Sequence, residues 1–426
     1  MTEKRHHVLL VGGGNGAFRA NRPETRTTFL TLRALLARFR GLDHHARVIA
    51  IQGDEPDEML IGLARMIHAT DPFDAVACLG EPLALLASRI AGALDLPGVP
   101  TPEVAIRIVD KERMRAHLVR AGLEEVRAYP VADVDELARI VTGGPEPAAW
   151  IVKPAAGSGS LGVSRVTAAS DLAEAFHRAA RPESPYDPDP GGRGVIVEPF
   201  LTGPQFSVES VSQGGVTSVL AITQKFSDPA TFVELGHVVP APISAAESDT
   251  IRDYVVALLD VLGVTDSVTH TELVLTPRGP RILETHARMG GDDIGEMASI
   301  VSGVNISAAA VELVLGESVQ DRLANSQPSG TAEAVWFVAS PEPGTFAGLD
   351  GVRDAEAVGS SVVVTELLSL GDPVEPLASS DSRVAQVRVS AASAKEAVAL
   401  AQEAAKRLSL RIAKRVPADV GAHGTV

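Results

Sequence analysis

The chain has 426 residues, 45% of them hydrophobic, and a formal net charge of −16 from 54 acidic and 38 basic residues. This length predicts roughly two to four domains or subdomains with cores of their own. The acidic balance argues against nucleic acid, or an anionic membrane surface, as the main partner.

The single cysteine, Cys78, excludes an internal disulfide framework and suits a reducing cytosol. It lies in the apolar run DAVACL, which indicates a buried core thiol rather than a nucleophile. We expect neither a signal peptide nor an apolar run of about 18 residues, so a cytoplasmic location without membrane contact is predicted.

The first hundred or so residues predict a small parallel sheet. Residues 8–11 form an apolar strand, and residues 12–17 follow as a tight turn that fits the dinucleotide pattern G-x-G-x-x-A. No acidic residue stands well placed about 20 residues on to hold a ribose, so a plain strand-to-helix turn outweighs a nicotinamide site. Further strands at 47–52 and 74–79 alternate with a helix at 82–93.

Two lysines come next. Lys111 opens the helix expected over residues 110–122, where by itself it is an ordinary solvated charge. The strand 150–153 ends in Lys153, a Gly/Ser-rich loop spans 155–162, and residues 163–166 return as a strand. Such a flap offers free N–H groups and hydroxyls that can close over phosphates. A mobile hairpin is the alternative, and the lysine at its base favours the phosphate flap. It is not a Walker loop, because no Gly-Lys-Ser/Thr ends it.

The strand 195–198 ends in Glu198 and passes into an apolar bend that contains Phe200 and Leu201. An acid followed by such a bend suits adenine, whose edge is bound by backbone groups while aliphatic side chains cover its faces. Strands at 205–211 and 216–224 make this half of the chain largely antiparallel. Farther on, Ser244 and Glu247 match a capping box that opens a helix.

Residues 268–293, VTHTELVLTPRGPRILETHARMGGDD, predict a hairpin with its turn at residues 277–279. This hairpin sets Glu272 and Glu284 side by side, and close carboxylates repel unless a cation lies between them. Carboxylate oxygens with water and phosphate are the ligands that Mg²⁺ prefers. Arg288 suits phosphate or carboxylate, and Gly290 and Gly291 let the backbone approach a ligand. A surface hairpin with solvated charges is the alternative.

One long apolar helix is predicted over residues 294–315, and a boundary falls at 325–330. The last segment holds short strands at 334–338, 362–367 and 383–389 and a helix at 394–408.

Taken in order, these features resemble the ATP-grasp superfamily. The resemblance implies an α/β protein with a Rossmann-like preATP-grasp domain, a lid subdomain, an antiparallel-sheet core and a C-terminal α+β appendage. The corresponding ranges are residues 1–107, 108–197, 198–325 and 326–426.

The resemblance also implies roles for residues at matching positions. Lys111 and Lys153 contact ATP phosphate or the adenine edge, and Arg288 and Lys153 assist catalysis by offsetting charge on the transferred phosphoryl group. The remaining ATP contacts are Gly157, Ser158, Gly159, Ser160, Gly162, Glu198, Phe200, Leu201 and Gln205. Many relatives have an acid near Gln205 for the ribose.

Glu272 and Glu284 are implied metal ligands. His286 stands where many relatives have Asn, and Mg²⁺ prefers oxygen, so His286 is the weaker third ligand. His237, Arg288, Gly290 and Gly291 are implied to contact the substrate. His237 is a lone histidine among strand-like residues, and such a residue is more often structural.

Within the superfamily, the segments GHVVPAPIS, ETHARMGGD, GDPVE and SRVAQVRVSAAS look most like L-amino acid ligases and carnosine-synthase-like enzymes. This implies an ADP-forming carboxylate–amine ligase that joins an amino acid or similar small carboxylate to an amine through an acylphosphate. ATP and Mg²⁺ are the implied cofactors, with Mn²⁺ as a substitute, and a homodimer is an expectation from relatives. The alternatives are a carboxylase or purine-synthesis-like enzyme, and a non-catalytic nucleotide-binding protein.

Overall fold

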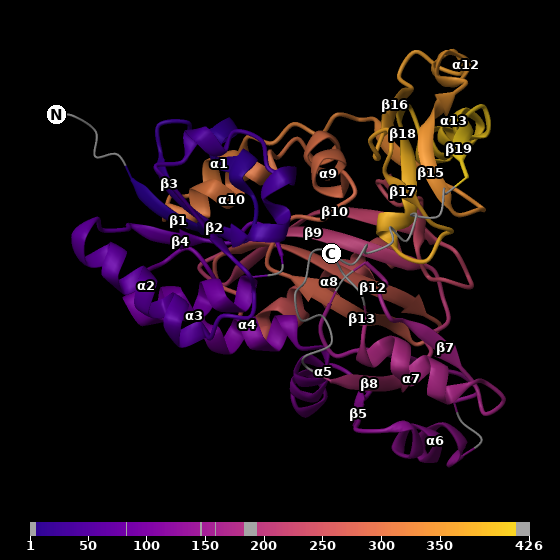
Figure 1. Cartoon of the computed structure of the whole chain (residues 1–426), viewed down its shortest axis with the longest axis horizontal. Coiled ribbons are helices and arrows are strands. Elements are labelled where there is room, and N and C mark those ends of the chain that lie inside the picture. Colours follow the sequence, from indigo (N-terminus) through magenta and orange to yellow (C-terminus); the bar gives the residue numbers. More distant parts are fainter. Residues whose placement is uncertain (1–5, 82, 145–146, 158, 183–193, 415–426) are drawn as a thin grey trace, which may run out of the picture.

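Four parallel strands form the N-terminal sheet (Figure 1). The computed structural model of the protein describes residues 6–81, 83–144, 147–157, 159–182 and 194–414. The strand order is β3-β2-β1-β4. The elements are β1 (His7–Val11), α1 (Asn15–Asn21), β2 (Arg26–Leu32), η1 (Arg33–Arg38), η2 (Leu42–His44), β3 (Arg47–Ile51), α2 (Asp57–Thr70), β4 (Ala75–Ala77) and α3 (Ala84–Leu94).

The sequence pattern does not predict β2, which lies between β1 and β3 in this sheet. Every residue of β2 after Arg26 is buried. A parallel strand covered on both faces shows no polar–apolar alternation, so periodicity does not reveal it. The glycine-rich turn does connect β1 to α1 as predicted. Gly14 has φ +85°, and a Cβ there would lie 2.3 Å from the Cβ of Leu79.

The lid is an antiparallel sheet with the order β5-β8-β6-β7. Helices α4 (Pro102–Val109) and α5 (Lys111–Arg120) connect it to the N-terminal sheet. Its elements are β5 (Tyr129–Val131), α6 (Val134–Thr142), β6 (Trp150–Pro154), β7 (Ser164–Val166), α7 (Leu172–Ala180) and β8 (Val195–Pro199). β6 and β7 pair as the predicted flap requires, with Val152 opposite Ser164.

An eight-stranded antiparallel sheet is the centre of the molecule, with the order β13-β12-β9-β10-β11-β14-β18-β16. Strands from the C-terminal segment therefore extend the same sheet that carries the predicted metal hairpin. The strands are β9 (Gln205–Gln213), β10 (Val216–Ser227), β11 (Glu234–Val239), β12 (Ser267–Thr276), β13 (Gly279–His286), β14 (Ala332–Ala339), β16 (Val363–Glu366) and β18 (Arg383–Ala391).

The two faces of this sheet differ in chemistry. One face packs on α8 (Ala245–Leu262), whose N-terminus has the predicted capping box of Ser244 and Glu247. Phe206, Leu273 and Ile282 of the sheet meet the apolar side of α8 in one buried cluster. Because side chains alternate along a strand, the neighbouring polar residues of β9, β10, β12 and β13 point to the opposite face. That polar face is turned toward the lid.

The predicted helix over residues 294–315 is wrong as a single helix. Two helices, α9 (Ile294–Ser302) and α10 (Ile306–Val314), meet at an angle of 100°. Gly303 ends α9 with φ +73°, and its backbone lies so near Gln327 that a Cβ would clash at 2.2 Å. Asn305 then caps α10 by accepting a hydrogen bond from the Ala308 N–H. Both helices are apolar, so composition alone does not reveal the break.

The C-terminal segment covers the far end of the core sheet. Its helix α13 (Ala394–Lys406) packs its alanine face on β14 and β18. The other elements here are α11 (Gln320–Ala324), β15 (Gly344–Asp350), α12 (Val352–Glu356), β17 (Pro373–Val374), η3 (Ser380–Ser382) and β19 (Ser409–Ala413).

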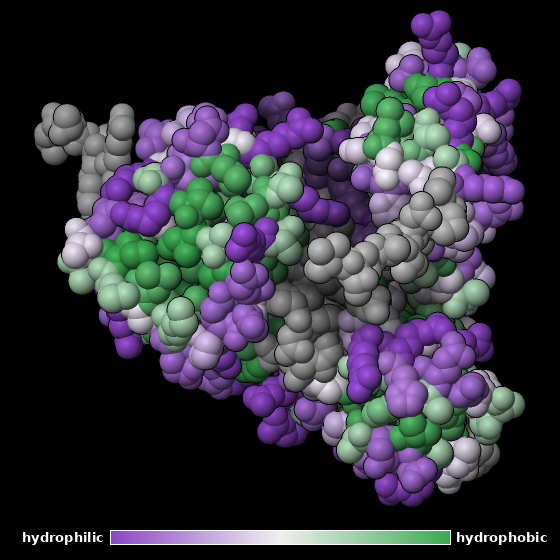
Figure 2. Space-filling view, in the orientation of Figure 1, coloured by the Kyte–Doolittle hydropathy of each residue, from purple (hydrophilic) through white to green (hydrophobic). Residues whose placement is uncertain are grey.

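In Figure 2 apolar side chains gather on the N-terminal part of the molecule, around the region of α2 and α3. Met59 and Met66 of α2 are 61% and 66% exposed. In the described part of the chain no single helix is long and apolar enough to cross a membrane, although the bent pair α9 and α10 has that composition together.

Candidate active site

A cavity of about 290 Å³ lies between the lid, the polar face of the core sheet and the C-terminal segment. Most of the residues predicted from the sequence line it: Lys111, Lys153, Gly157, Gly159, Ser160, Glu198, Phe200, Leu201, Gln205, His237, Glu272, Glu284, Arg288 and Gly291. Gly162, His286 and Gly290 are outside its lining, and Ser158 lies outside the described residues.

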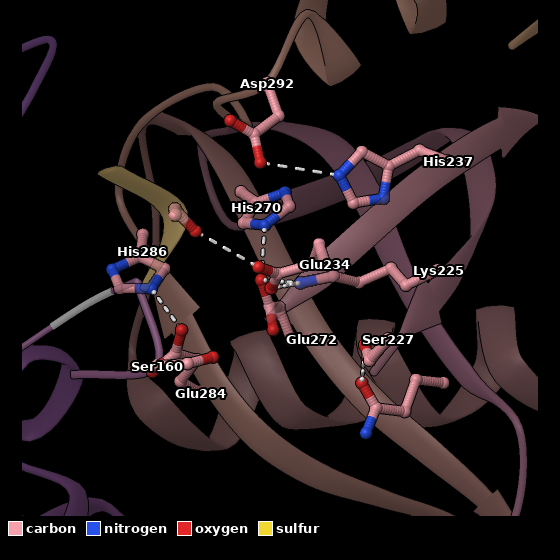
Figure 3. A network of polar contacts seen from close by, with 12 residues as sticks. Ser160, Lys225, Ser227, Glu234, His237, His270, Glu272, Glu284, His286 and Asp292 are labelled. Atoms are coloured by element: carbon pink, nitrogen blue, oxygen red, sulfur yellow. Dashed lines mark hydrogen bonds and ion pairs between the residues drawn. The ribbon is translucent and has the colours of Figure 1, made fainter. Parts of the chain in front are cut away.

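Two carboxylates face each other on the hairpin of β12 and β13 (Figure 3). Glu272 is paired directly with Glu284, and His270 with His286. The Glu272 and Glu284 side chains are 16% and 18% exposed, and both line the cavity. The turn at residues 277 and 278 sets the register as far as Leu273, and a β-bulge between Leu273 and Glu272 then shifts it by one residue and brings Glu272 opposite Glu284.

Cations surround both carboxylates. Lys225 of β10 contacts Glu272, and Lys111 Nζ lies 2.9 Å from Glu284 Oε2. Burial alone raises the pKa of a carboxyl, but Lys225 outweighs it and lowers the pKa of Glu272 to about 2. Burial is likewise outweighed at Glu284, where Lys111 and His286 hold the pKa well below its usual value. Both groups are therefore ionised at neutral pH.

His270 is a further charged group at this site. Burial lowers its pKa, but Glu209 and Glu272 outweigh burial and raise the pKa to about 9. Glu209 also accepts a hydrogen bond of 2.9 Å from the backbone N–H of Gly290. A Cβ at Gly290 would lie 2.7 Å from His270 Nδ1, so this glycine allows a close backbone–side-chain approach. Gly291, in contrast, lines the cavity.

The lid end of the cavity holds a buried ion pair. Lys153 Nζ donates to Glu198 Oε1 at 2.6 Å, and Arg115 Nε reaches Glu198 Oε2 at 3.3 Å. The apolar bend of Phe200 and Leu201 follows directly and lines the same end. Charged and apolar side chains thus meet at the end of the cavity where the sequence predicts the adenine.

The flap lies over the cavity and contacts three other parts of the chain. Gly157 O accepts a hydrogen bond from Lys111 Nζ at 2.7 Å, and Ser160 Oγ donates to Phe232 O at 3.1 Å. A Cβ at Gly159 would lie 3.8 Å from Ser380 of the C-terminal segment. Gly162 instead packs beside Arg178 of α7, which explains its place outside the cavity.

Arg288 is held by Glu81, a residue that follows β4 of the N-terminal sheet. Its Nη2 lies 2.8 Å from Glu81 Oε2, and Glu81 Oε1 lies 2.5 Å from His286 Nδ1. Glu81 and Arg288 join the two parts of the chain beside a small second cavity that Cys78 and His286 also line. His286 Nε2 lies 3.2 Å from Glu284. His286 therefore lies between Glu81 and the carboxylate pair.

The sequence pattern does not predict several charged residues of this site. They are Glu81, Glu209, Lys225, Glu234, Asp292 and Arg383. Glu81 had a usable signal, because it follows the carboxyl end of the parallel strand β4, where sites form in such sheets. His270 also had one, since it stands two residues before Glu272 on one strand and so shares its face.

The carboxylate pair suits Mg²⁺ by its chemistry. In the described residues no group of three or more His, Cys, Asp or Glu side chains could hold a metal ion. Two carboxylates with phosphate oxygens and water are, however, a common way to bind Mg²⁺. Glu272 and Glu284 fit this, because both are ionised, adjacent and open to the cavity.

Comparison with known proteins gives two family matches. A model described as an ATP-grasp domain matches residues 146–296, and one described as the L-amino acid ligase C-terminal domain 2 matches residues 336–413. Residues 146–296 therefore form an ATP-grasp domain. The first match includes the flap, the Lys153–Glu198 pair and the carboxylate hairpin of this ATP-grasp protein, and the second includes β18 and α13.

Several individual proteins are similar to this chain. An L-amino acid ligase from Bacillus licheniformis has a similar crystal structure, with a TM-score of 0.80 and 22% identity, covering 97% of this chain and 100% of that one. An uncharacterized protein of Sinorhizobium fredii is 26% identical over 74% of this chain, and carnosine synthase 1 of Mus musculus is 24% identical over 64%. The ATP-grasp protein described here spans 64% and 34% of the lengths of these two relatives.

Proposed function

We propose that this ATP-grasp protein is an ADP-forming carboxylate–amine ligase that joins an amino acid, or a related small carboxylate, to an amine. The observation that carries the proposal is the ionised pair Glu272 and Glu284, set in one cavity with Lys111 and Arg288. Such a charge arrangement serves phosphoryl transfer, in which catalysis is mainly positioning and electrostatic stabilisation. The likeness to named ligases supports the same class.

ATP and Mg²⁺ are the cofactors of the proposal. Lys153, Glu198 and the bend at Phe200 and Leu201 would hold the adenine end, and the flap from Gly157 would cover the phosphates. Glu272 and Glu284 would hold Mg²⁺, which offsets phosphate charge when bound. Among the described residues near this site we assign no side-chain nucleophile.

The reaction has two steps. A carboxylate oxygen of the first substrate attacks the γ-phosphorus, and the bond to ADP breaks. An amine then attacks the acyl carbon, the carbon–oxygen bond to phosphate breaks, and the amine loses a proton. Arg288 would face the negative charge of the transferred group. The flap would exclude water, because a free acylphosphate hydrolyses.

The test is release of ADP and phosphate with Mg²⁺ and ATP across a panel of amino acids, singly and in pairs. Turnover that needs a pair, with the coupled product found by mass, supports the ligase. Turnover with bicarbonate as the only acid would support the carboxylase alternative instead. Tight ATP binding without turnover on any acid would support a non-catalytic nucleotide-binding protein.

A further inference from the structure

Asp292 places a carboxylate on the wall of the main cavity, four residues after Arg288. Its side chain is 28% exposed, and it lines the cavity next to Gly291 and Ser380. Asp292 has φ +54° and Asp293 has φ +61°. Non-glycine residues rarely hold this conformation unless the surrounding structure fixes it, and such residues cluster at ligand sites.

The C-terminal strand β18 fixes this loop. Arg383 donates from Nη1 and Nη2 to the two oxygens of Asp292, each at 2.7 Å. The guanidinium lies 3.9 Å over the ring of Phe337, and Nε donates to Ser380 O at 2.8 Å. Gln386 holds the neighbouring Asp293 at 2.8 Å. Because Arg383 is fixed on three sides, the Asp292 carboxylate has one orientation.

Asp292 keeps hydrogen-bonding capacity on its cavity side. A carboxylate offers roughly four acceptor positions. Arg383 uses two, and His237 Nε2 lies 3.5 Å from Oδ2 (Figure 3). His237 is buried and also lines the cavity, and its Nδ1 has no hydrogen-bond partner among the described residues. The Asp292 carboxylate thus keeps an unused acceptor position at this end of the cavity.

The charges at this end are layered. Arg383 is 6% exposed against 28% for Asp292, and Lys225 is 3% exposed against 14% for Glu234. Asp292 lines the cavity whereas Arg383 does not; Lys225 and Glu234 both line it, and Glu234 is the more exposed of the two. A bound molecule at this end therefore meets oxygen atoms with partial or full negative charge, which favours a cation.

We propose that Asp292, positioned by Arg383, binds a cationic nitrogen of the substrate. This nitrogen is either the α-ammonium group of an amino acid or the side-chain ammonium of a basic one. The inference rests on the proposed function, in which Arg288 faces the anionic end of the reaction. Residues 288–292 would then offer a cation and an anion on one loop. The C-terminal segment has the role of holding that loop.

The experiment is calorimetric binding to the full chain loaded with Mg²⁺ and a non-hydrolysable ATP analogue. Three ligands separate the two sources. Lysine has both ammonium groups, norleucine has only the α-ammonium, and 6-aminohexanoate has only the distal one. We expect Asp292→Asn to weaken lysine binding about 10- to 100-fold, the size of a charged hydrogen bond.

If Asp292 binds the side-chain ammonium, Asp292→Asn weakens the binding of lysine and 6-aminohexanoate and leaves the affinity for norleucine unchanged. If Asp292 binds the α-ammonium, the variant weakens the binding of lysine and norleucine and leaves the affinity for 6-aminohexanoate unchanged. The proposal is overturned if Asp292→Asn weakens the binding of all three ligands equally or of none. It is also overturned if the wild-type protein binds none of the three.

Asp293→Asn is the matched control, because Asp293 lies on the same loop outside the cavity lining. It should leave all three affinities unchanged. Arg383→Gln should weaken the binding of the same ligands as Asp292→Asn, because the Asp292 carboxylate then loses the side chain that orients it. The binding measurement needs no turnover. If the protein shows this ligand selectivity but forms no amide product, the proposed function is refuted. The assignment of Asp292 as a cation site would still stand.

Discussion

Glu81 and Arg288 form an ion pair at 2.8 Å between residues 207 positions apart in the chain. Glu81 follows β4 of the N-terminal sheet, and Arg288 follows β13 of the core sheet. The same carboxylate contacts His286 at 2.5 Å, beside the Glu272–Glu284 pair. The N-terminal sheet therefore sets the position of two cationic side chains at the candidate active site.

Glu81→Gln tests this relationship. The amide removes the charge that orients Arg288 and His286, and a misplaced catalytic group costs about 10- to 100-fold in rate. We expect kcat to fall by that factor while the KM for ATP changes little, as steady-state ADP release would show. Glu103→Gln is a suitable control, because Glu103 is 75% exposed in an i,i+4 pair with Arg107. Equal kcat in the two variants would contradict the positioning role.

Glu284→Gln tests the metal site. The amide keeps the shape but removes one of two charged ligands, so Mg²⁺-dependent ADP release should be abolished. The fold should persist, because Lys111 keeps a hydrogen bond to Gly157 O. Glu296→Gln, on α9 with a side chain 65% exposed, is the control. Activity at the wild-type level, over a titration of Mg²⁺, would sink the assignment.

Lys153→Met tests the nucleotide end. Lys153 is buried against Glu198, so its loss should weaken ATP binding about 10- to 100-fold by removing a charged hydrogen bond. It also leaves Glu198 with Arg115 alone, and breaking a buried pair costs about 3–5 kcal/mol of stability. Calorimetric ATP titration and thermal melting separate the two effects. Lys406→Met on the exposed side of α13 serves as the control, and unchanged ATP affinity in Lys153→Met would count against the flap and adenine assignment.

Cys78 should be chemically inert in the native protein. It is 7% exposed, and burial raises the pKa of its thiol to about 12. The buried core thiol expected from the sequence is confirmed. Native protein at pH 8 should resist alkylation, and unfolded protein should react fully, as mass measurement would show. Cys78→Ser should keep full activity, and lost activity with an unchanged melting curve would mean that the thiol takes part in catalysis.

His7 should make the protein less stable in mild acid. It is 4% exposed, with Nε2 3.0 Å from Thr28 Oγ1, and burial, then Arg26, lowers its pKa below 6.5. In mild acid His7 therefore takes up a proton more readily in the unfolded chain than in the native protein. Stability is present above pH 6.5 and falls as the pH drops below it. Denaturant unfolding between pH 7.5 and 5 should show a shallower decline for His7→Gln, and parallel curves would exclude this cause.

The local pattern of the sequence was enough for the hairpin and the flap. Strands β12 and β13 follow from alternating side chains and a Pro-Arg-Gly turn, and a short turn fixes the register between neighbouring strands. The register of the turn alone would place Glu272 opposite Leu283, and a β-bulge between Glu272 and Leu273 shifts the pairing by one residue to Glu284. The capping box at Ser244 and the strand end at Lys153 are likewise local, since each depends on residues within a few positions.

Only the tertiary structure decided which distant residues complete the site. Lys225, Glu81 and Arg383 come from β10, from the end of β4 and from β18, and nothing near them in the chain marks them as partners of Glu272, Arg288 and Asp292. The break between α9 and α10 is similar, because it depends on Gly303 meeting the backbone of Gln327. Local spacing determines strands, turns and caps. The packing of the sheets decides which remote segments form ion pairs. It also decides where the chain bends between α9 and α10.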